Sequence, residues 1–456
     1  MNREGIPMTS PMVCLTLPLA CALLWLCLAS AGCGQPSPMT QPDAPRAVGA
    51  EAYYRWLIGC MEAIERDIPA ITRSAEAAAD VYLKDGVEIG AYGERALVSE
   101  VCGRAGGMMT IVRADTVSSP EWKGIVLLFP QEDALQEDFA AARRFKAEGK
   151  TIVAFGRRAI LAAAAGDGVA FDASIENHAA PHGGLFASGD GNWLVPTDPP
   201  ASIAAAWVWT GEFVAALTRR GKMPAMHQSI FVPGAADRAA KLHDLKFHPD
   251  SPMKIAPGAV AREFLRETRR SLAALHAEDM PAIVKVAELA VRTRQAGRQV
   301  WTFAHGHAIT RHVGCPHDPG YFKQINRGLF GLKRDAVIER GDFVFCVGYD
   351  RIFQGWYFKD ATERMRKAGA VLAWSMTDYN TDPNTGPAAI GSDEILIGQH
   401  WAFGDAVATV PGYDAKIIPS SGVISEAVLW MTEAEMMRLL ADKTRPEPPR
   451  SGPASP

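Results

Sequence analysis

The sequence predicts an α/β protein made of two tandem doubly wound domains, in which helices cover both faces of a parallel β-sheet. One observation behind this prediction is that short, continuous apolar runs alternate with longer runs of helical periodicity, a pattern typical of buried parallel strands and their crossover helices. The other is that the same succession of elements occurs twice, over residues 50–225 and again over residues 258–442. A tandem duplication of one βα unit accounts for both observations.

The composition is that of a chain with large apolar cores. Of its 456 residues, 48% are hydrophobic and 21% are charged, and the formal net charge is −4. A chain of this length corresponds to two or three domains. The charge balance gives no indication of a nucleic-acid partner, because nucleic-acid binding calls for a basic surface.

The first 33 residues stand apart from the rest. An apolar core follows the single arginine Arg3 and ends in small residues before Cys33, which is typical of a secretory signal with a bacterial lipoprotein cleavage box. Ser30 stands where that box usually has leucine. We expect residues 1–33 to be a lipoprotein-type signal peptide that is lipidated at Cys33, with an uncleaved apolar anchor as the alternative. Residues 34–49 are expected to form a flexible tether. The lipidated leader and the tether together predict an extracytoplasmic, membrane-anchored protein that faces the periplasm.

The two repeats begin alike. A long helical pattern, over residues 51–79 in the first repeat and 261–294 in the second, places apolar residues at helical spacing. A glycine follows each pattern, and then comes a short strand with a glycine turn, at residues 87–93 and 300–306. This is the beginning of a βα unit.

The remaining landmarks keep the same order in both repeats. An apolar strand is followed by a helix and a further strand, then by an Ile-x-x-His segment and a last strand that leads into a final helix. We expect residues 226–257 to link the two domains and residues 443–456 to form a disordered tail. The landmarks are residues 124–129, 145–155, 175–178, 194–198 and 201–217 in the first repeat, and 341–347, 365–374, 397–400, 417–421 and 423–440 in the second.

The second repeat carries the densest candidate site. A short aromatic strand at residues 300–303 runs into a tight turn, His305-Gly306-His307, and then into a helix. In an open α/β sheet, ligands bind off the carboxyl end of a strand and against the amino end of the next helix. This turn is therefore the predicted ligand crevice.

The same residues resemble the sugar isomerase (SIS) domain superfamily. Residues 303–307 are similar to the Phe-Gly-Thr-Gly-His turn of a small group of SIS proteins, and residues 404–412 with 419–422 are similar to that group's Gly-Asp-Ala … Pro-x-Ser-Thr segment. Two such units in tandem resemble the paired-domain phosphosugar isomerases. The resemblance implies flavodoxin-like or Rossmann-like domains, a sugar or phosphosugar ligand and no cofactor.

The chain departs from that family at the phosphate site. The family holds its phosphate on a loop rich in Ser and Thr after the second strand, whereas residues 348–355 contain neither. The equivalent loop of the first repeat carries Glu132 and Asp133, which repel a phosphate. An anion could be held in the second repeat only by backbone amides and Arg351. This departure favours a binding protein with weak or no catalysis over an isomerase.

His305, His307 and Glu426 are the candidate catalytic residues. A histidine can carry a proton near neutral pH, as aldose–ketose isomerisation requires. The two histidines could instead bind a metal, or could cap the helix and make contacts across the domain interface. Glu426, on the last helix, is the best candidate for a general base, and a solvated surface position is the alternative.

Further residues are candidates for ligand binding. Ser420 and Ser421 precede the last helix and could bind a sugar hydroxyl or a phosphate, or could simply cap the helix. His400 has a counterpart at His178, which suggests a shared structural role as readily as a ligand contact. The other candidates lie at the turn and in the loop after the second strand, and they are Gly306, Thr310, Tyr349 and Arg351.

Three functions remain open at this point. The first is an exported protein that binds a carbohydrate derivative. The second is a phosphosugar isomerase that uses His305 or His307 with Glu426. The third is a structural envelope lipoprotein whose crevice is filled by side chains such as Trp301 or Trp401. A crevice closed by Trp301, Tyr349 or Trp401 would exclude both ligand-binding functions. An open crevice in which His305, His307 and Ser421 converge within about 4–6 Å of one point would favour catalysis. The sequence leaves the oligomeric state open, with a homodimer as one outcome.

Overall fold

The computed structural model describes residues 49–115, 122–250, 253–326, 332–333, 336–352 and 358–444. The predicted signal peptide with Cys33, the tether up to residue 48 and the tail after Thr444 lie outside the described residues. The described residues, from 49 to 444, belong to one compact unit. The predicted domain bounds within it stay a prediction.

Each half of the chain contains a five-stranded sheet, and all neighbouring strands in both sheets are parallel. The first sheet has the order β2-β1-β3-β4-β5, and the second has the corresponding order β9-β8-β10-β11-β12. The predicted fold class is therefore confirmed. The strands are β1 (Val87–Gly93), β2 (Ile111–Arg113), β3 (Lys123–Phe129), β4 (Thr151–Gly156) and β5 (Ala173–Glu176), then β8 (Val300–Ala304), β9 (Lys323–Gln324), β10 (Phe343–Tyr349), β11 (Val371–Met376) and β12 (Ile395–Gly398).

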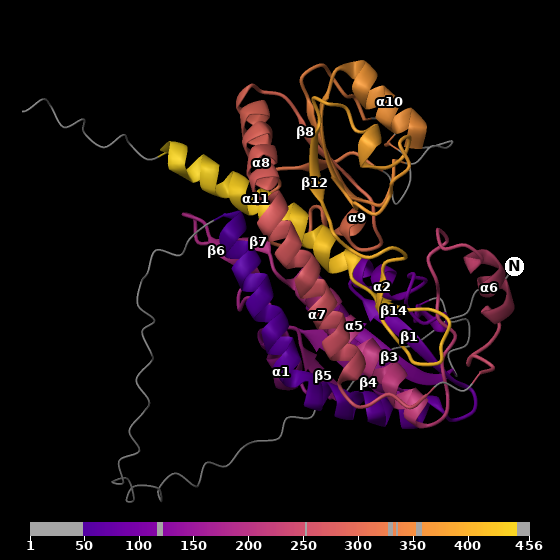
Figure 1. The fold of residues 1–456 in the computed structure, drawn as a ribbon. Helices are drawn as coiled ribbons and strands as arrows, with labels where there is room; N and C mark the ends of the chain where they lie inside the picture. The colour runs from indigo at the N-terminus through magenta and orange to yellow at the C-terminus, as the bar shows by residue number, and fades with distance from the viewer. Residues whose placement is uncertain are drawn as a thin grey trace, which may run out of the picture. The chain divides into compact units, whose positions relative to one another are not determined.

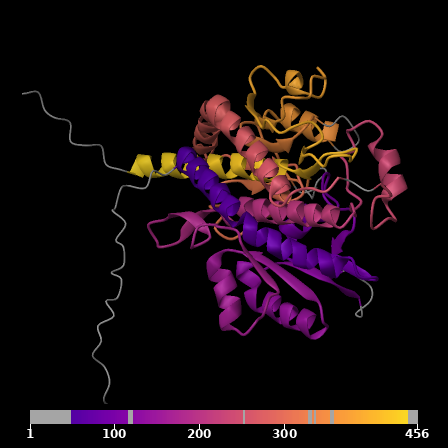
Figure 2. The same cartoon turned by 60° about the horizontal axis from the view of Figure 1, so that its bottom comes forward.

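Long helices lie between the two sheets (Figures 1 and 2). Their apolar residues and those of one face of each sheet form a single core that runs through both halves. Burial of this shared apolar surface holds the halves together. The helices are α1 (Ala50–Tyr82), α5 (Asp198–Arg219), α7 (Ala259–Ala274), α8 (Met280–Gln295) and α11 (Ser421–Thr444), with a π-helical turn, η2 (Leu275–Asp279), between α7 and α8.

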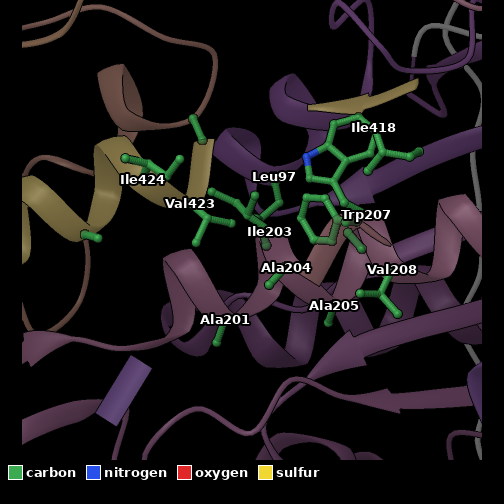
Figure 3. Packing of buried hydrophobic residues seen from close by; sticks show 14 of the residues in the cluster. Leu97, Ala201, Ile203, Ala204, Ala205, Trp207, Val208, Ile418, Val423 and Ile424 are labelled. Atoms are coloured by element: carbon green, nitrogen blue, oxygen red, sulfur yellow. The ribbon is translucent and has the colours of Figure 1, made fainter. Parts of the chain in front are cut away.

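Helix α5 is buried along nearly its whole length, because every residue from Pro199 to Thr218 is shielded from solvent. It is long and apolar enough to cross a membrane, but it lies inside the protein. Figure 3 shows Trp207 and Ile203 of α5 close to Ile418 and Val423 of the second half. Several alanines on α5 allow the neighbouring helices to approach closely.

The shorter helices α3, α4 and α10 cover the outer faces of the sheets, so each sheet is doubly wound. In the first half, α3 and α4 cover a second apolar cluster that includes Val126, Leu128 and Phe139. In the second half, α10 covers a cluster that includes Val344 and Met365. The shorter helices are α2 (Arg95–Val101), α3 (Leu135–Ala147), α4 (Arg158–Gly166), α6 (Ala235–Leu242), α9 (Ile309–His312) and α10 (Phe358–Ala368).

A short antiparallel hairpin precedes the last helix of each half. Strands β6 (Gly184–Ala187) and β7 (Trp193–Pro196) lead into α5, and β13 (Ala406–Ala408) and β14 (Ile417–Pro419) lead into α11. The sequence predicts the second strand of each hairpin and misses the first, which is only three or four residues long. Val195 and Ile418 both have a φ of 65°, which is strained for a β-branched residue.

Candidate functional site

Two cavities open at the carboxyl ends of the strands. The first cavity, of about 490 Å³, lies at the end of the first sheet, and residues 310–312 and 314–317 of the second half form its opposite wall. The second cavity, of about 330 Å³, lies at the end of the second sheet and is closed from the other side by residues 103–105 and 227–231. Each cavity is thus built by both halves of the chain.

The second cavity contains the predicted turn. His305, Gly306 and His307 line it from the end of β8, and Gly348 and Asp350 line it from the end of β10. Its other walls come from the hairpin, from the amino end of α11, and from segments of the first half and the link. The polar and aromatic residues among these walls are Arg104, His227, Gln228, Ser229, Phe231, Tyr379, Trp401, Asp405, Ser421 and Ser425.

A close backbone approach at the end of β10 requires glycine. Gly348 has a φ of 89°, and a Cβ atom placed on it would lie 2.0 Å from the backbone oxygen of His305. Any side chain at this position would push the ends of β8 and β10 apart. The cavity floor therefore depends on Gly348, which the sequence did not single out.

His307 is held as a neutral imidazole. Its Nδ1 lies 3.1 Å from the backbone oxygen of Ser99, so this nitrogen donates and carries the proton. Burial and the nearby Arg104 guanidinium lower the pKa of His307 to about 3. At neutral pH the other ring nitrogen, Nε2, of such a weak base is unprotonated. It can accept a hydrogen bond, but it has no proton to give to a substrate. Its neighbour His305 lies against the ring of Tyr349, with the ring centroids 5.3 Å apart.

The amino end of α11 is already occupied by a carboxylate. Asp405 accepts hydrogen bonds from the backbone amide of Ser421 at 2.9 Å and from its hydroxyl at 2.8 Å. Arg104, from the first half, reaches across and donates to Asp405 at 2.8 Å and also to the Ser421 hydroxyl. A helix amino end attracts anions. Here the chain supplies the anion itself, so a phosphate has no free place there.

Asp350 is the unusual carboxylate of the second cavity. It is 6% exposed, and burial raises its pKa to about 6. Its Oδ2 lies 3.3 Å from Nε of Arg351. Within the described part of the chain, its Oδ1 has no hydrogen-bond partner. A buried carboxylate oxygen without a donor is costly.

The structure brings some of the predicted site residues together and separates others. His305, Gly306, His307 and Ser421 line the second cavity, whereas Thr310 lines the first and donates to the backbone oxygen of Gly306 at 3.0 Å. The others line neither cavity. These are Tyr349 in the core of the second sheet, Arg351 stacked on Phe231, His400 beside Asp279, the buried helix-end residue Ser420, and Glu426.

Glu426 does not line the cavity that His305 and His307 line, and it does not lie on the surface. It is fully buried on α11, where Oε1 lies 2.6 Å from Nδ1 of His312 and Oε2 accepts from the Trp430 indole. Nε2 of His312 lies 3.3 Å from Glu94. Burial alone would lower the pKa of His312, but the two carboxylates outweigh it and raise the pKa to about 10. The imidazolium is therefore fixed between Glu94 and Glu426, and neither of its nitrogens is free for chemistry.

His400 and His178 have matching structural positions. Nε2 of His400 lies 2.7 Å from Asp279 in the turn η2, and Nε2 of His178 lies 2.7 Å from Asp67 in α1. Both histidines have a positive φ, 54° and 57°. Each connects the end of its sheet to the long helix that begins its half. This geometry favours the structural alternative for His400.

The first cavity is larger, but its buried and half-buried charges already have partners. Glu132 binds His317 at 2.8 Å and Arg157 at 2.6 Å. Asp198 accepts from Asn177 at 3.1 Å, and Glu94 accepts from the first amides of α2 in addition to its contact with His312. A ligand would have to break these internal pairs. We therefore regard the second cavity as the better candidate site.

Sequence reasoning missed Arg104, Asp350 and Asp405. Asp405 lies in the Gly-Asp-Ala segment that carries the family resemblance, so its position was available as a signal. Asp350 follows the second strand, at the point where ligand-binding residues occur in such sheets. Arg104 belongs to the other half of the chain, and no local pattern indicates that it reaches the site. Among the residues that the structure describes, no three His, Cys, Asp or Glu side chains form a group that could hold a metal ion.

No protein-family model matches this chain, and no curated protein matches it. Among solved structures, it is similar to a candidate phosphosugar isomerase from Clostridium difficile 630, with 9% identity over 89% of this chain and 97% of that chain and a TM-score of 0.42. It is also similar to the C-terminal domain of glucosamine-fructose-6-phosphate aminotransferase from Francisella tularensis. The identity is 9% over 84% of this chain and 95% of that chain, and the TM-score is 0.44.

A third similar structure is a candidate sugar binding protein from Salmonella typhimurium LT2. The identity is 9% over 84% of this chain and 99% of that chain, and the TM-score is 0.38. The fold class itself rests on the strand order, and the site rests on the contacts described above.

Proposed function

We propose that the chain binds a carbohydrate derivative in the second cavity, with weak or no catalysis. The observation that supports this most directly is that the crevice beside Gly306 is open: Trp301 and Tyr349 do not line it, and Trp401 forms part of its wall. Its volume of about 330 Å³ falls at the small end of the usual range of ligand sites. Hydroxyl, carboxylate, imidazole and aromatic groups face it together, which suits a polar ring with apolar faces.

Weak or absent catalysis follows from the state of the candidate acid and base groups. Aldose–ketose isomerisation needs a base whose pKa lies near the working pH. The pKa of His307 is about 3, and Glu426 lies outside the cavity in a pair with His312. The alternative, an active phosphosugar isomerase, is favoured by one observation, namely that the pKa of Asp350 is about 6, which suits a general base.

A phosphate group fits this cavity poorly. Arg104 is the one arginine or lysine among the described residues that line it, and it already binds Asp405 and Ser421. Burial lowers the pKa of both His227 and His307, so both are neutral at pH 7. These groups support a ligand without phosphate over a phosphosugar.

A substitution at the mouth of the cavity tests the proposal. Ala236 is exposed on α6 and lines the second cavity, whereas Ala240 is exposed on the same helix and does not line it. We expect a panel of sugars and amino sugars to raise the melting temperature of the full-length protein, because a ligand that binds only the folded state stabilises it. Ala236→Trp should abolish this shift by filling the mouth.

The matched control is Ala240→Trp, which should keep the ligand-induced shift. Loss of the shift in both variants, or in neither, would contradict the assignment of the ligand to this cavity. Shifts with phosphorylated sugars alone, together with aldose–ketose turnover, would instead support the isomerase. The absence of any shift would leave the third function, a structural envelope protein.

The cellular location belongs to the same proposal. The leader pattern before Cys33 supports export and a lipid anchor that faces the periplasm. The mass of the mature amino-terminal peptide tests it, since a diacylated Cys33 is far heavier than an unmodified one.

A further inference from the structure

We infer that residues 228–245, which include α6, form a lid that opens and closes the second cavity, and that the ion pair between Arg238 and Asp414 is its latch. These residues are called the lid segment. The inference goes beyond the proposed function, because it concerns access to the cavity and holds for any ligand that binds there.

The lid segment forms the outer wall of the second cavity. Residues 228–231 line the cavity from the beginning of the segment, and Ala235, Ala236 and Ala239 line it from α6. Across the cavity lie the turn after β8 and the end of β10. Figures 1 and 2 show α6 at the edge of the molecule, outside the layers formed by the sheets and the long helices. Movement of this segment alone would therefore open the cavity.

Both ends of the lid segment are fixed at neighbouring places. At one end, the backbone amide of His227 donates to the backbone oxygen of Gly107 at 2.8 Å. At the other end, the amide of His248 donates to the backbone oxygen of Met223 at 2.7 Å. Among the described residues, the backbone groups between these ends form hydrogen bonds with one another and not with the rest of the protein. A segment fixed in this way can move as a unit about its two ends.

Apolar packing holds the lid segment only weakly. The buried residues of α6 are Ala235 and Leu242, and neither belongs to the apolar clusters of described residues that pack against the two sheets. Ile230, which lines the cavity, is 81% exposed. Regions with few buried apolar contacts open at a small cost in free energy. The lid segment should therefore open more often than the long helices of the core.

An ion pair connects the middle of the lid segment to the second half. Arg238 donates to both carboxylate oxygens of Asp414, in the turn between β13 and β14, at 2.9 Å each. Nearer the beginning of the segment, the Phe231 ring packs against the Arg351 guanidinium, whose carbon lies 3.7 Å from the ring centroid. Asp414 is 56% exposed, so solvent screens its attraction to Arg238. A contact of this strength keeps the lid closed and still allows it to open.

The rate of labelling of a cysteine inside the cavity measures how often the lid opens, without any ligand. Ala308 lines the cavity and is only 2% exposed, so the new thiol of Ala308→Cys meets a bulky reagent, fluorescein maleimide, when the lid moves aside. Mass spectrometry of the peptide that contains residue 308 separates this thiol from the native cysteines. We expect Arg238→Met to speed the labelling about fivefold or more, because loss of the latch raises the open fraction.

Arg366→Met, in the same Ala308→Cys background, is the matched control. Arg366 makes a comparable pair with both carboxylate oxygens of Glu394, at 2.7 and 2.9 Å, and it does not line the cavity. This variant should leave the labelling rate unchanged. Equal rates with Arg238→Met and Arg366→Met would overturn the inference. Labelling of Ala308→Cys as fast as that of a free thiol would also overturn it, because the cavity would then have no lid.

Hydrogen–deuterium exchange of the full-length protein decides the question if Ala308→Cys does not fold. Peptides from α6 should exchange faster than peptides from α5, and Arg238→Met should speed the exchange of α6 further. Exchange of α6 as slow as that of α5, or unchanged in Arg238→Met, would contradict the lid. Neither measurement uses a sugar, so the lid can be disproved while the proposed function stands, and the sugar titrations can fail while the lid is confirmed.

Discussion

Replacing His312 with leucine is expected to lower the free energy of unfolding by about 3–5 kcal/mol, because it leaves a buried carboxylate without its partner. His312 is 2% exposed and lies between Glu426 at 2.6 Å and Glu94 at 3.3 Å. Glu426 is fully buried, so among the described residues its carboxylate would keep only the Trp430 indole as a donor. Urea denaturation of the wild type and of His312→Leu at pH 7 measures the difference.

The double variant His312→Leu with Glu426→Leu is the control for this prediction. It removes both charges and should recover most of the loss, since apolar residues can replace a buried ion pair at little cost. A double variant as unstable as the single one would show that packing, not charge, is the cause.

The same ion pair makes stability depend on pH. The pKa of His312 rises from an unfolded value of about 6.5 to about 10 in the folded protein. The stabilisation is therefore complete below about pH 6.5 and is lost as the pH rises towards 10, where the folded state gives up its proton. We expect the stability of the wild type, relative to the double variant, to fall from pH 7 to pH 9.

Replacing Arg104 with methionine is expected to cost about 3–5 kcal/mol of stability and to abolish ligand binding. The side chain of Arg104 is 9% exposed and connects the two halves through Asp405 and Ser421, and it also pairs with Glu100 of its own half. Without it, two carboxylates remain in the interior, and Ser421 loses a partner that fixes the wall of the second cavity. Denaturation and sugar titration of the same sample measure both effects.

Arg158→Met is the matched control, because Arg158 is 81% exposed although it pairs with Glu176 at 3.0 Å. A pair of this kind contributes at most about 1 kcal/mol. If Arg104→Met were no more harmful than Arg158→Met, the contact between the halves would not be a determinant of the site.

The fold could be predicted from the sequence because burial leaves a local signal. The strands predicted at residues 124–129 and 341–347 are β3 and β10, whose apolar runs face cores on both sides. The pattern over residues 261–294 suggested one helix. The structure divides it at the turn η2, just before Pro281, and this division places Asp279 beside His400. A helical pattern does not show such a turn, because the apolar spacing continues through it.

The site could be predicted only where its residues are neighbours in the sequence. His305, Gly306 and His307 share one turn, and Ser421 begins the helix that faces it. The solvated surface position that was the alternative for Glu426 is wrong, because α11 is buried on nearly every side and has no polar face from which exposure could be inferred. Arg104 enters the site from about 200 residues away in the sequence. Its role depends on how the halves meet, which no local pattern records.

The most direct test of the ligand site is hydrogen–deuterium exchange of the full-length protein, with and without the sugar that gives the largest thermal shift. Amide exchange slows where a ligand stabilises the local structure. We expect slower exchange in peptides that cover residues 303–309 and 420–425, with no change over residues 94–98 and 130–134. Slower exchange confined to residues 94–98 and 130–134 would place the ligand in the first cavity and contradict the account.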